Sequence, residues 1–121
     1  MTAQASHVTA DTLAALADRT RMRIIELLSS QDRCVCHLVD DLELGQSIVS
    51  HHVGVLRRSG LVTSYPHARD RRWMYYRLDR EALRALGSGL LNIASPDTYN
   101  PEPLACVVST SRTIDLEDTG A

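Results

Sequence analysis

The stretch between residues 46 and 78 constrains the fold more than any other part of this sequence, because a helical pattern is followed by a hairpin pattern. Residues 46–58 place three aliphatic side chains on one helical face, at spacings of four and three: Val49, Val53 and Leu56. Polar side chains occupy most of the other faces. A helix of this kind suits the DNA major groove, although an ordinary amphipathic surface helix has the same pattern.

Two segments rich in β-branched and aromatic residues, 61–65 and 73–78, follow this helix after Gly60. Because turn-forming and charged residues separate them, we expect an antiparallel hairpin. From residue 46 to residue 78 there are six arginines and one acid, a local charge of +5 in a chain of net charge −2. Such a cationic surface suits a phosphate backbone. A helix-turn-helix followed by a basic hairpin predicts a winged-helix DNA-binding domain.

The length of 121 residues fits one domain with a modest core. Aromatic residues make up 4% and phenylalanine is absent, so aliphatic side chains must fill the interior, and a small core of this kind often gains from dimerisation. The sequence shows neither a signal peptide nor an apolar run of about 18 residues, the length that spans a membrane. We therefore expect a cytoplasmic protein with no membrane partner, whose three cysteines stay reduced unless something binds them.

Upstream of this stretch, the sequence predicts three helices. We expect residues 1–10 to form a loose arm and Asp11 to cap the first helix. Asp18 is expected to cap the second helix, with Met22, Ile25 and Leu28 facing inward.

The third helix begins at Cys34 or Cys36, ends near Leu42 and leads into a tight turn at Gly45. With a further helix after the hairpin, the expected fold is mostly α with a small β-hairpin, in the order α-α-α-α-β-β-α.

The helix after the hairpin is expected to begin at an Asp79 cap and to carry one apolar stripe: Leu83, Leu86, Leu90 and Ile93. Pairing of this stripe with the first helix and with a second copy would give a homodimer that matches a palindromic operator. Alternatively, the stripe only completes the core of the monomer.

The composition changes after residue 95, which predicts two regions. Residues 1–95 form the DNA-binding and dimerisation domain, and residues 96–121 form a flexible acidic tail with five acids and one arginine. The tail carries one apolar segment, residues 104–108, which contains Cys106.

Cys34 and Cys36 stand at the predicted start of the third helix. On a regular helix they would point in different directions, but in a frayed first turn or an extended chain both can reach one ion. Helix N-terminal amides also favour the thiolate form that binds metals. An equally open interpretation is that both are small, buried, unreactive side chains.

The whole order resembles the ArsR/SmtB family of metal- and metalloid-responsive repressors. The resemblance covers roughly residues 13–91 and rests on four motifs: Leu16-Ala17-Asp18-Arg19-Thr20-Arg21, Cys34-Val35-Cys36, Gln46-Ser47-Ile48-Val49-Ser50-His51-His52 and Leu56-Arg57-Arg58-Ser59-Gly60-Leu61-Val62. It implies a dimeric winged-helix repressor, not an enzyme, that leaves DNA when an ion binds.

In the arsenical branch of that family, Cys-Val-Cys followed by Asp-Leu-Cys supplies three thiolates. Here His37 replaces the aspartate and Val39 replaces the third cysteine, so Cys106 is the only remaining thiol. The 11 residues from Ser95 to Cys106 can extend on the order of 35 Å. The resemblance thus implies metal ligands Cys34, Cys36 and Cys106, on one chain or across two.

Three thiolates suit As(III) or Sb(III) as inducer, with Cd(II), Pb(II) or Hg(II) as alternatives, and no organic cofactor is expected. A zinc site on the last helix is not expected, because that helix has no histidine. A closed zinc site elsewhere would want four ligands, with His37 or His7 making up the number.

The expected DNA contacts lie on the helix 46–58 and on the hairpin. Base edges or phosphates would be met by Gln46, Ser47, Ser50, His51 and His52. Phosphates or the minor groove would be met by Arg57, Arg69, Arg71 and Arg72.

Three other functions stay open on the sequence. One is a redox-switch repressor in which Cys106 forms a disulfide with Cys34 or Cys36, and another is a winged-helix protein with inert cysteines. A small thiol-disulfide enzyme is the third, although the βαβ pattern of such folds is missing.

Overall fold

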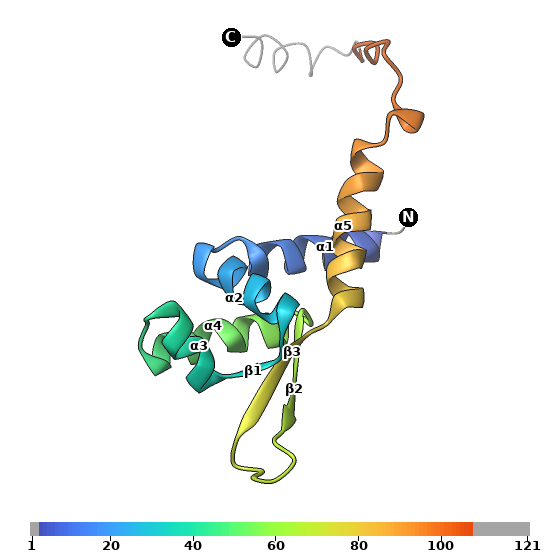
Figure 1. Cartoon of the computed structure of the whole chain (residues 1–121). Coiled ribbons are helices and arrows are strands. Elements are labelled where there is room, and N and C mark those ends of the chain that lie inside the picture. Colours follow the sequence, from blue (N-terminus) through green and yellow to red (C-terminus); the bar gives the residue numbers. More distant parts are fainter. Residues whose placement is uncertain (1–2, 108–121) are drawn as a thin grey trace.

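The computed structural model describes residues 3–107, which form five helices, three strands and one short 3-10 helix (Figure 1). In chain order the elements are α1 (Ala3–Leu16), α2 (Arg19–Ser30), β1 (Arg33–Cys34), α3 (Val35–Leu42), α4 (Gln46–Arg58), β2 (Val62–Pro66), β3 (Met74–Leu78), α5 (Arg80–Ala94) and η1 (Pro96–Thr98). The predicted mostly helical winged-helix fold is confirmed, with one additional strand. None of the described helices is long and apolar enough to cross a membrane.

Two helices begin at the caps that the sequence predicts. The side chain of Asp18 accepts the backbone N–H of Arg21, and that of Asp79 accepts the backbone N–H of Ala82. Each carboxylate thereby satisfies one of the N–H groups that have no partner inside the helix.

The first helix starts earlier than predicted. α1 begins at Ala3, so the loose arm expected over residues 1–10 is wrong for its described part, and the exposed Asp11 lies within the helix rather than at its cap. Residues 3–10 contain no proline or glycine to stop a helix. The packing of α1 against α5, α2 and α4 supplies the support that the weak apolar pattern did not reveal.

The hairpin extends into a three-stranded antiparallel sheet of order β1-β3-β2. Its third strand, β1, has only two residues, which pair Arg33 with Tyr76 and Cys34 with Tyr75. A strand this short has no alternating pattern from which to predict it. β1 ties the start of α3 directly to the hairpin.

A small aliphatic core lies between α2, α3, α4 and the base of the hairpin. Its most deeply buried side chains are Ile24, Leu28, Leu38, Leu56, Leu61 and Val49. The prediction that Met22 faces inward is wrong, because Met22 is exposed and Ile24 is buried instead. The turn between α3 and α4 also differs from expectation, because its left-handed residue is Glu43, whereas Gly45 has the φ of an ordinary N-cap.

The apolar stripe of α5 is only partly covered. Leu86 is buried and Leu83 packs against the core, but Leu90 is exposed and Ile93 is 80% exposed. α5 packs on α1, and the chain after it continues away from the other helices (Figure 1). The core of the monomer therefore covers only the first half of the stripe.

Candidate metal centre and nucleic-acid interface

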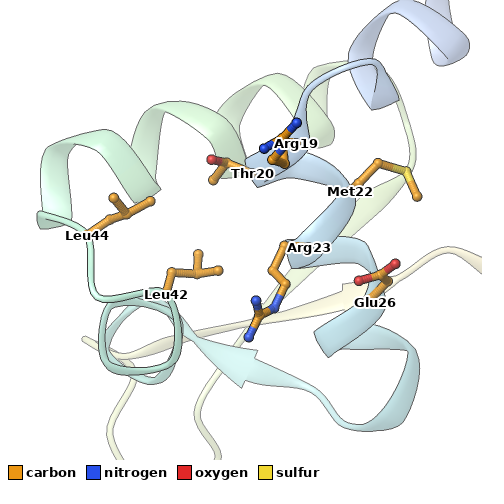
Figure 2. A pocket seen from close by; sticks show the side chains of 7 residues that line it. All are labelled: Arg19, Thr20, Met22, Arg23, Glu26, Leu42 and Leu44. Carbon is orange, nitrogen blue, oxygen red and sulfur yellow. The ribbon is translucent and has the colours of Figure 1, made fainter.

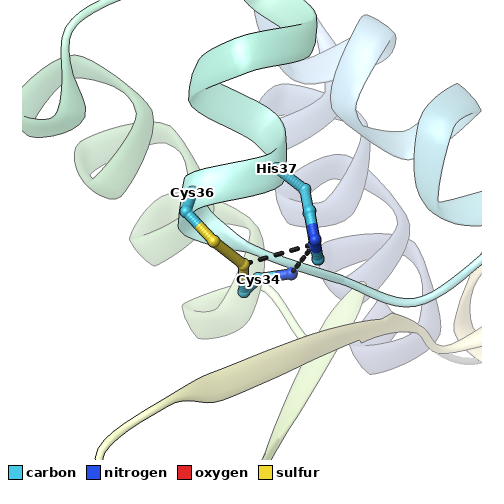
Figure 3. Close-up of a disulfide and its surroundings, with 3 residues drawn as sticks. All are labelled: Cys34, Cys36 and His37. Atoms are coloured by element: carbon cyan, nitrogen blue, oxygen red, sulfur yellow. Dashed lines mark hydrogen bonds between the residues drawn. A yellow bond between two sulfur atoms is a disulfide. The ribbon is translucent and has the colours of Figure 1, made fainter.

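Cys34 and Cys36 lie at the junction between β1 and α3. Cys34 ends the strand and is the N-cap of the helix, with 4% of its surface exposed, whereas Cys36 is exposed in the first helical turn. Their sulfurs form a disulfide, with the two Cα atoms 5.3 Å apart (Figure 3). The extended backbone of Cys34 places both sulfurs on the same side, which a regular helix would not do.

His37 is the third donor at this junction. Its Nδ1 lies 3.2 Å from Cys34 Sγ and accepts the backbone N–H of Cys34, also at 3.2 Å (Figure 3). The donor atoms of Cys34, Cys36 and His37 all lie within 4.8 Å of one another. Two sulfurs and an imidazole nitrogen at this spacing fit one thiophilic ion once the disulfide is reduced. In the sequence, the one indication that His37 belongs to this group is its position directly after Cys36.

Cys106 is not brought to this junction. It is free and exposed, and residues 99–107 lie beyond the end of α5, on the side away from α3 (Figure 1). The disulfide considered for the redox alternative, between Cys106 and the pair, is not formed, because Cys34 bonds to Cys36 instead. The apolar segment predicted at residues 104–108 is exposed up to residue 107, and residue 108 lies outside the described residues.

A hollow of about 320 Å³ opens beside the sulfur pair. Its remaining walls come from His37 and from the hairpin: His67, Asp70, Trp73 and Tyr75. The ring of Tyr75 has two histidine rings near it. Its centroid lies 5.5 Å from that of His67 and 6.3 Å from that of His37. The sulfur pair thus faces the aromatic side of the hairpin.

Asp32, two residues before Cys34, holds the base of the hairpin. It accepts hydrogen bonds from the hydroxyl of Tyr65 and from Arg77, whose guanidinium also lies 4.7 Å from the centre of the Tyr65 ring. The hydrogen bond from Tyr65, followed by that from Arg77, keeps the pKa of the Asp32 carboxyl below its usual range. The loop before β1 is thereby fixed to β2 and β3.

The helix α4 exposes most of the predicted DNA-contacting side chains: Gln46, Ser47, Ser50, His51 and Arg57. Val49, Val53 and Leu56 anchor the opposite face in the core. Ile48 is half exposed among the polar residues and is not one of the predicted contacts. An apolar side chain here can contact the methyl group of a thymine.

His52 occupies a different environment from its neighbours. Its Nδ1 lies 3.0 Å from a guanidinium nitrogen of Arg21 and 3.9 Å from a carboxylate oxygen of Asp18. Hydrogen bonding from the backbone N–H of Arg21, together with the charges of Arg21 and His52, lowers the pKa of Asp18. The side chain of His52 therefore ties α4 to the start of α2.

The turn between β2 and β3 presents Arg69, Arg71 and Arg72 to solvent. Arg72 forms an ion pair with Asp70 at 2.8 Å, which lowers the pKa of that carboxyl. In the part of the chain that the structure describes, no acidic group lies within ion-pair distance of Arg69 or Arg71. His67 orders the turn, since its Nδ1 accepts the backbone N–H groups of Arg69 and Asp70.

A second hollow, of about 400 Å³, lies between α2 and the turn that precedes α4 (Figure 2). It is lined by Arg19, Thr20, Met22, Arg23, Glu26, Leu42 and Leu44. It contains no cysteine or histidine, so it does not offer the ligands of a second thiophilic site.

Comparison with known proteins agrees with this geometry. Residues 18–64 match the family described as "Bacterial regulatory protein, arsR family". The chain is 34% identical over 92 residues to the arsenic resistance transcriptional regulator ArsR1 of Pseudomonas putida, covering 74% of this chain and 70% of that protein. It is 41% identical over 64 residues to the arsenical resistance operon repressor of Escherichia coli, which is 52% of each protein.

A solved structure of a possible transcriptional regulator for arsenical resistance is also similar. It superposes with a TM-score of 0.62 at 32% identity, covering 72% of this chain and 88% of that one. The agreement includes both the helix-turn-helix and the fold around it. The chain belongs to the ArsR family of helix-turn-helix transcriptional regulators.

Proposed function

We propose that this protein is a homodimeric repressor that binds double-stranded operator DNA and releases it when As(III) or Sb(III) binds its cysteine thiolates. The observation that carries the proposal is the convergence of Cys34 and Cys36 at the start of α3, the helix that packs on α4. The P. putida and E. coli relatives, whose names refer to arsenic or arsenical resistance, support the choice of ion.

The thiolates become available when the disulfide is reduced. Two equivalents of a monothiol donate two electrons and two protons, which gives the thiols of Cys34 and Cys36 and the disulfide of the reductant. A trivalent ion then needs a third sulfur, and we assign that role to Cys106, from the tail of the same chain or of the second copy. The expected ligands are therefore Cys34, Cys36 and Cys106.

The second copy would pack on the uncovered half of α5. Leu90, Leu91 and Ile93 are exposed there, and α1 lies alongside. Covering these aliphatic side chains is favourable at about 25 cal/mol per Å² of apolar surface. A two-fold axis through this surface would present two α4 helices to two half-sites of an operator.

Each copy would contact DNA through α4 and the hairpin. The exposed Gln46, Ser47, Ser50 and His51 suit base edges or phosphates, and Arg57, Arg69, Arg71 and Arg72 suit phosphates or the minor groove. His52, which contacts Arg21, would act by fixing the orientation of α4 and meet DNA only through its exposed edge.

Release would follow from the position of Cys34 between two DNA-contacting elements. Through β1 it pairs with Tyr75 of the hairpin, and through α3 it is connected to α4. Movement of Cys34 toward a shared ion would therefore shift both elements. By linkage, ion and operator each weaken the binding of the other, typically by about 1–3 kcal/mol.

The disulfide supports a second candidate, a repressor that responds to oxidation. In this case closing the Cys34–Cys36 bond would itself change DNA affinity, and no ion would be needed. Cd(II), Pb(II) and Hg(II) are alternative ions for the same thiolates.

One titration separates these candidates. The full-length protein is reduced with a phosphine, because dithiols chelate arsenicals, and its affinity for its own promoter is measured by fluorescence anisotropy. As(III), Sb(III), Cd(II), Pb(II), Hg(II) and Zn(II) are then added to the wild type and to Cys36→Ser. We expect As(III) and Sb(III) to release DNA from the wild type only. Release by oxidant but by no ion would select the redox repressor.

A further inference from the structure

We propose that the hollow beside Cys34 and Cys36 receives the organic group of a trivalent organoarsenical, R–As(OH)₂, and that an aryl group fits best. The inference rests on the proposed function and names the class of arsenical that this site takes. It comes from two observations: the structure brings together two sulfurs and not three, and an aromatic hollow adjoins them.

The number of sulfurs decides which arsenicals the junction alone can hold. Inorganic As(III) has three exchangeable hydroxyl groups and is fully bound by three thiolates. In R–As(OH)₂ one valence is already taken by carbon, so two thiolates complete the arsenic. Cys34 and Cys36 supply these two at the junction of β1 and α3, whereas residues 99–107, the segment that contains Cys106, lie beyond the far end of α5 (Figure 1).

The hollow suits a flat apolar group. An apolar cavity of about 150 Å³ holds a benzene molecule, and this hollow measures about 320 Å³. Tyr75 already has ring neighbours in Tyr65 and His67. Trp73 is 52% exposed, and its side chain hydrogen-bonds to Asp70. Its ring has no ring partner among the described residues, so the faces of the indole can contact an aryl group. Aromatic pairs add about 0.5–1.5 kcal/mol to the burial of their area.

The step needs no oxidant once the two cysteines are thiols. The Cys34 and Cys36 sulfurs each form one bond to arsenic, two As–O bonds break, and each thiol proton leaves with a hydroxide as water. Arsenic remains trivalent and keeps its carbon. The products are the protein-bound R–As unit and two water molecules.

Trp73 provides a direct readout, because it is the single tryptophan of the chain. Phenylarsonous acid is added to the phosphine-reduced full-length protein, and indole fluorescence and intact mass are recorded. We expect a fluorescence change and a mass increase of the acid minus two waters, in the wild type and in Cys106→Ser but not in Cys36→Ser. Equal responses of wild type and Cys36→Ser, or no adduct on the wild type, would overturn the proposal.

A second measurement tests the hollow through DNA release. Phenylarsonous acid, methylarsonous acid and arsenite are compared on the promoter complexes of wild type, Trp73→Ala and the control Tyr99→Ala, an exposed aromatic residue outside the hollow. We expect the phenyl compound to act at a concentration at least tenfold below that of arsenite, and Trp73→Ala to remove most of that advantage. Arsenite release without a phenyl advantage overturns this inference alone. Adduct formation without release by any arsenical overturns the proposed function alone.

Discussion

Cys34 pairs with Tyr75 across the β1–β3 ladder, so one member of the sulfur pair is the strand neighbour of a residue in the hairpin proposed to contact DNA. The ring of Tyr75 also lies next to His67, whose Nδ1 accepts the backbone N–H groups of Arg69 and Asp70 in the turn between β2 and β3. The proposed ion site and the hairpin arginines are thus connected by contiguous contacts.

Replacing Tyr75 should uncouple the two sites. In Tyr75→Leu we expect the ion to bind as in the wild type, while its effect on DNA affinity falls about tenfold, which corresponds to about 1.4 kcal/mol of coupling. Tyr99→Leu, outside the sheet, is the control. Anisotropy titrations with and without As(III) give the coupling. If the ratio of the two DNA affinities in Tyr75→Leu equals that of the wild type, Tyr75 does not connect the ion site to DNA binding.

Mixed dimers can locate the third thiolate. Neither Cys36→Ser nor Cys106→Ser alone should respond fully to As(III). A dimer of one Cys36→Ser copy and one Cys106→Ser copy has an intact Cys34–Cys36 pair on one chain and Cys106 on the other. We expect this mixed dimer to regain half of the ion sites if the site spans two chains. If the mixed dimer regains no ion sites, Cys106 and the pair that it completes lie on the same chain. A wild-type mixture prepared in the same way is the control and must respond to As(III).

Arg69 and Arg71 of the hairpin turn should set the salt dependence of DNA binding. Arg71→Ala removes one phosphate contact, so the slope of log K against log salt should become shallower by about 0.9, equally on specific and non-specific DNA. The control Arg84→Ala changes an exposed arginine of α5. Identical slopes for Arg71→Ala and wild type would argue against phosphate contact by the turn.

Asp32 should make stability depend on pH. Its pKa is lowered in the folded protein, so its contribution is complete above the unfolded pKa and is lost as the pH falls through the lower folded value. Asp32→Asn should therefore cost about 1–2 kcal/mol at neutral pH, and progressively less as the pH falls below the unfolded pKa of the carboxyl. Urea unfolding at several pH values measures this, and the exposed Asp97→Asn should show no such trend.

The burial of Leu38 predicts its contribution to the free energy of unfolding. Leu38 is fully buried where α3 meets α4, so Leu38→Ala should destabilise the fold by about 2–5 kcal/mol. Leu104 is 94% exposed, and Leu104→Ala should change the free energy of unfolding by less than about 0.5 kcal/mol. A loss below 1 kcal/mol in Leu38→Ala would show that the core does not depend on this contact.

The sequence predicted the parts of the fold that have strong local signals. Asp18 and Asp79 were recognisable as caps because their carboxylates precede helical patterns, and α4 follows the spacing of Val49, Val53 and Leu56. Tertiary contacts determined the rest. Residues 3–10 are helical where α1 packs on other elements, and β1 exists only because β3 pairs with its two residues.

The candidate site was predictable in its ligand types but not in its surroundings. Cys34 and Cys36 attract attention by spacing alone. The approach of Tyr75 and Trp73, about 40 residues later in the chain, follows from the pairing of β1 with β3, which no local pattern indicates. The contact of His52 with Arg21 likewise joins two helices far apart in sequence.

In the proposed mechanism, ion and operator each weaken the binding of the other to one protein. The most direct measurement is the affinity of As(III) for the reduced dimer, by calorimetry, with and without saturating operator. We expect weaker As(III) binding in the operator complex, by the same factor by which As(III) weakens DNA binding. Equal As(III) affinities for free and DNA-bound protein would contradict it.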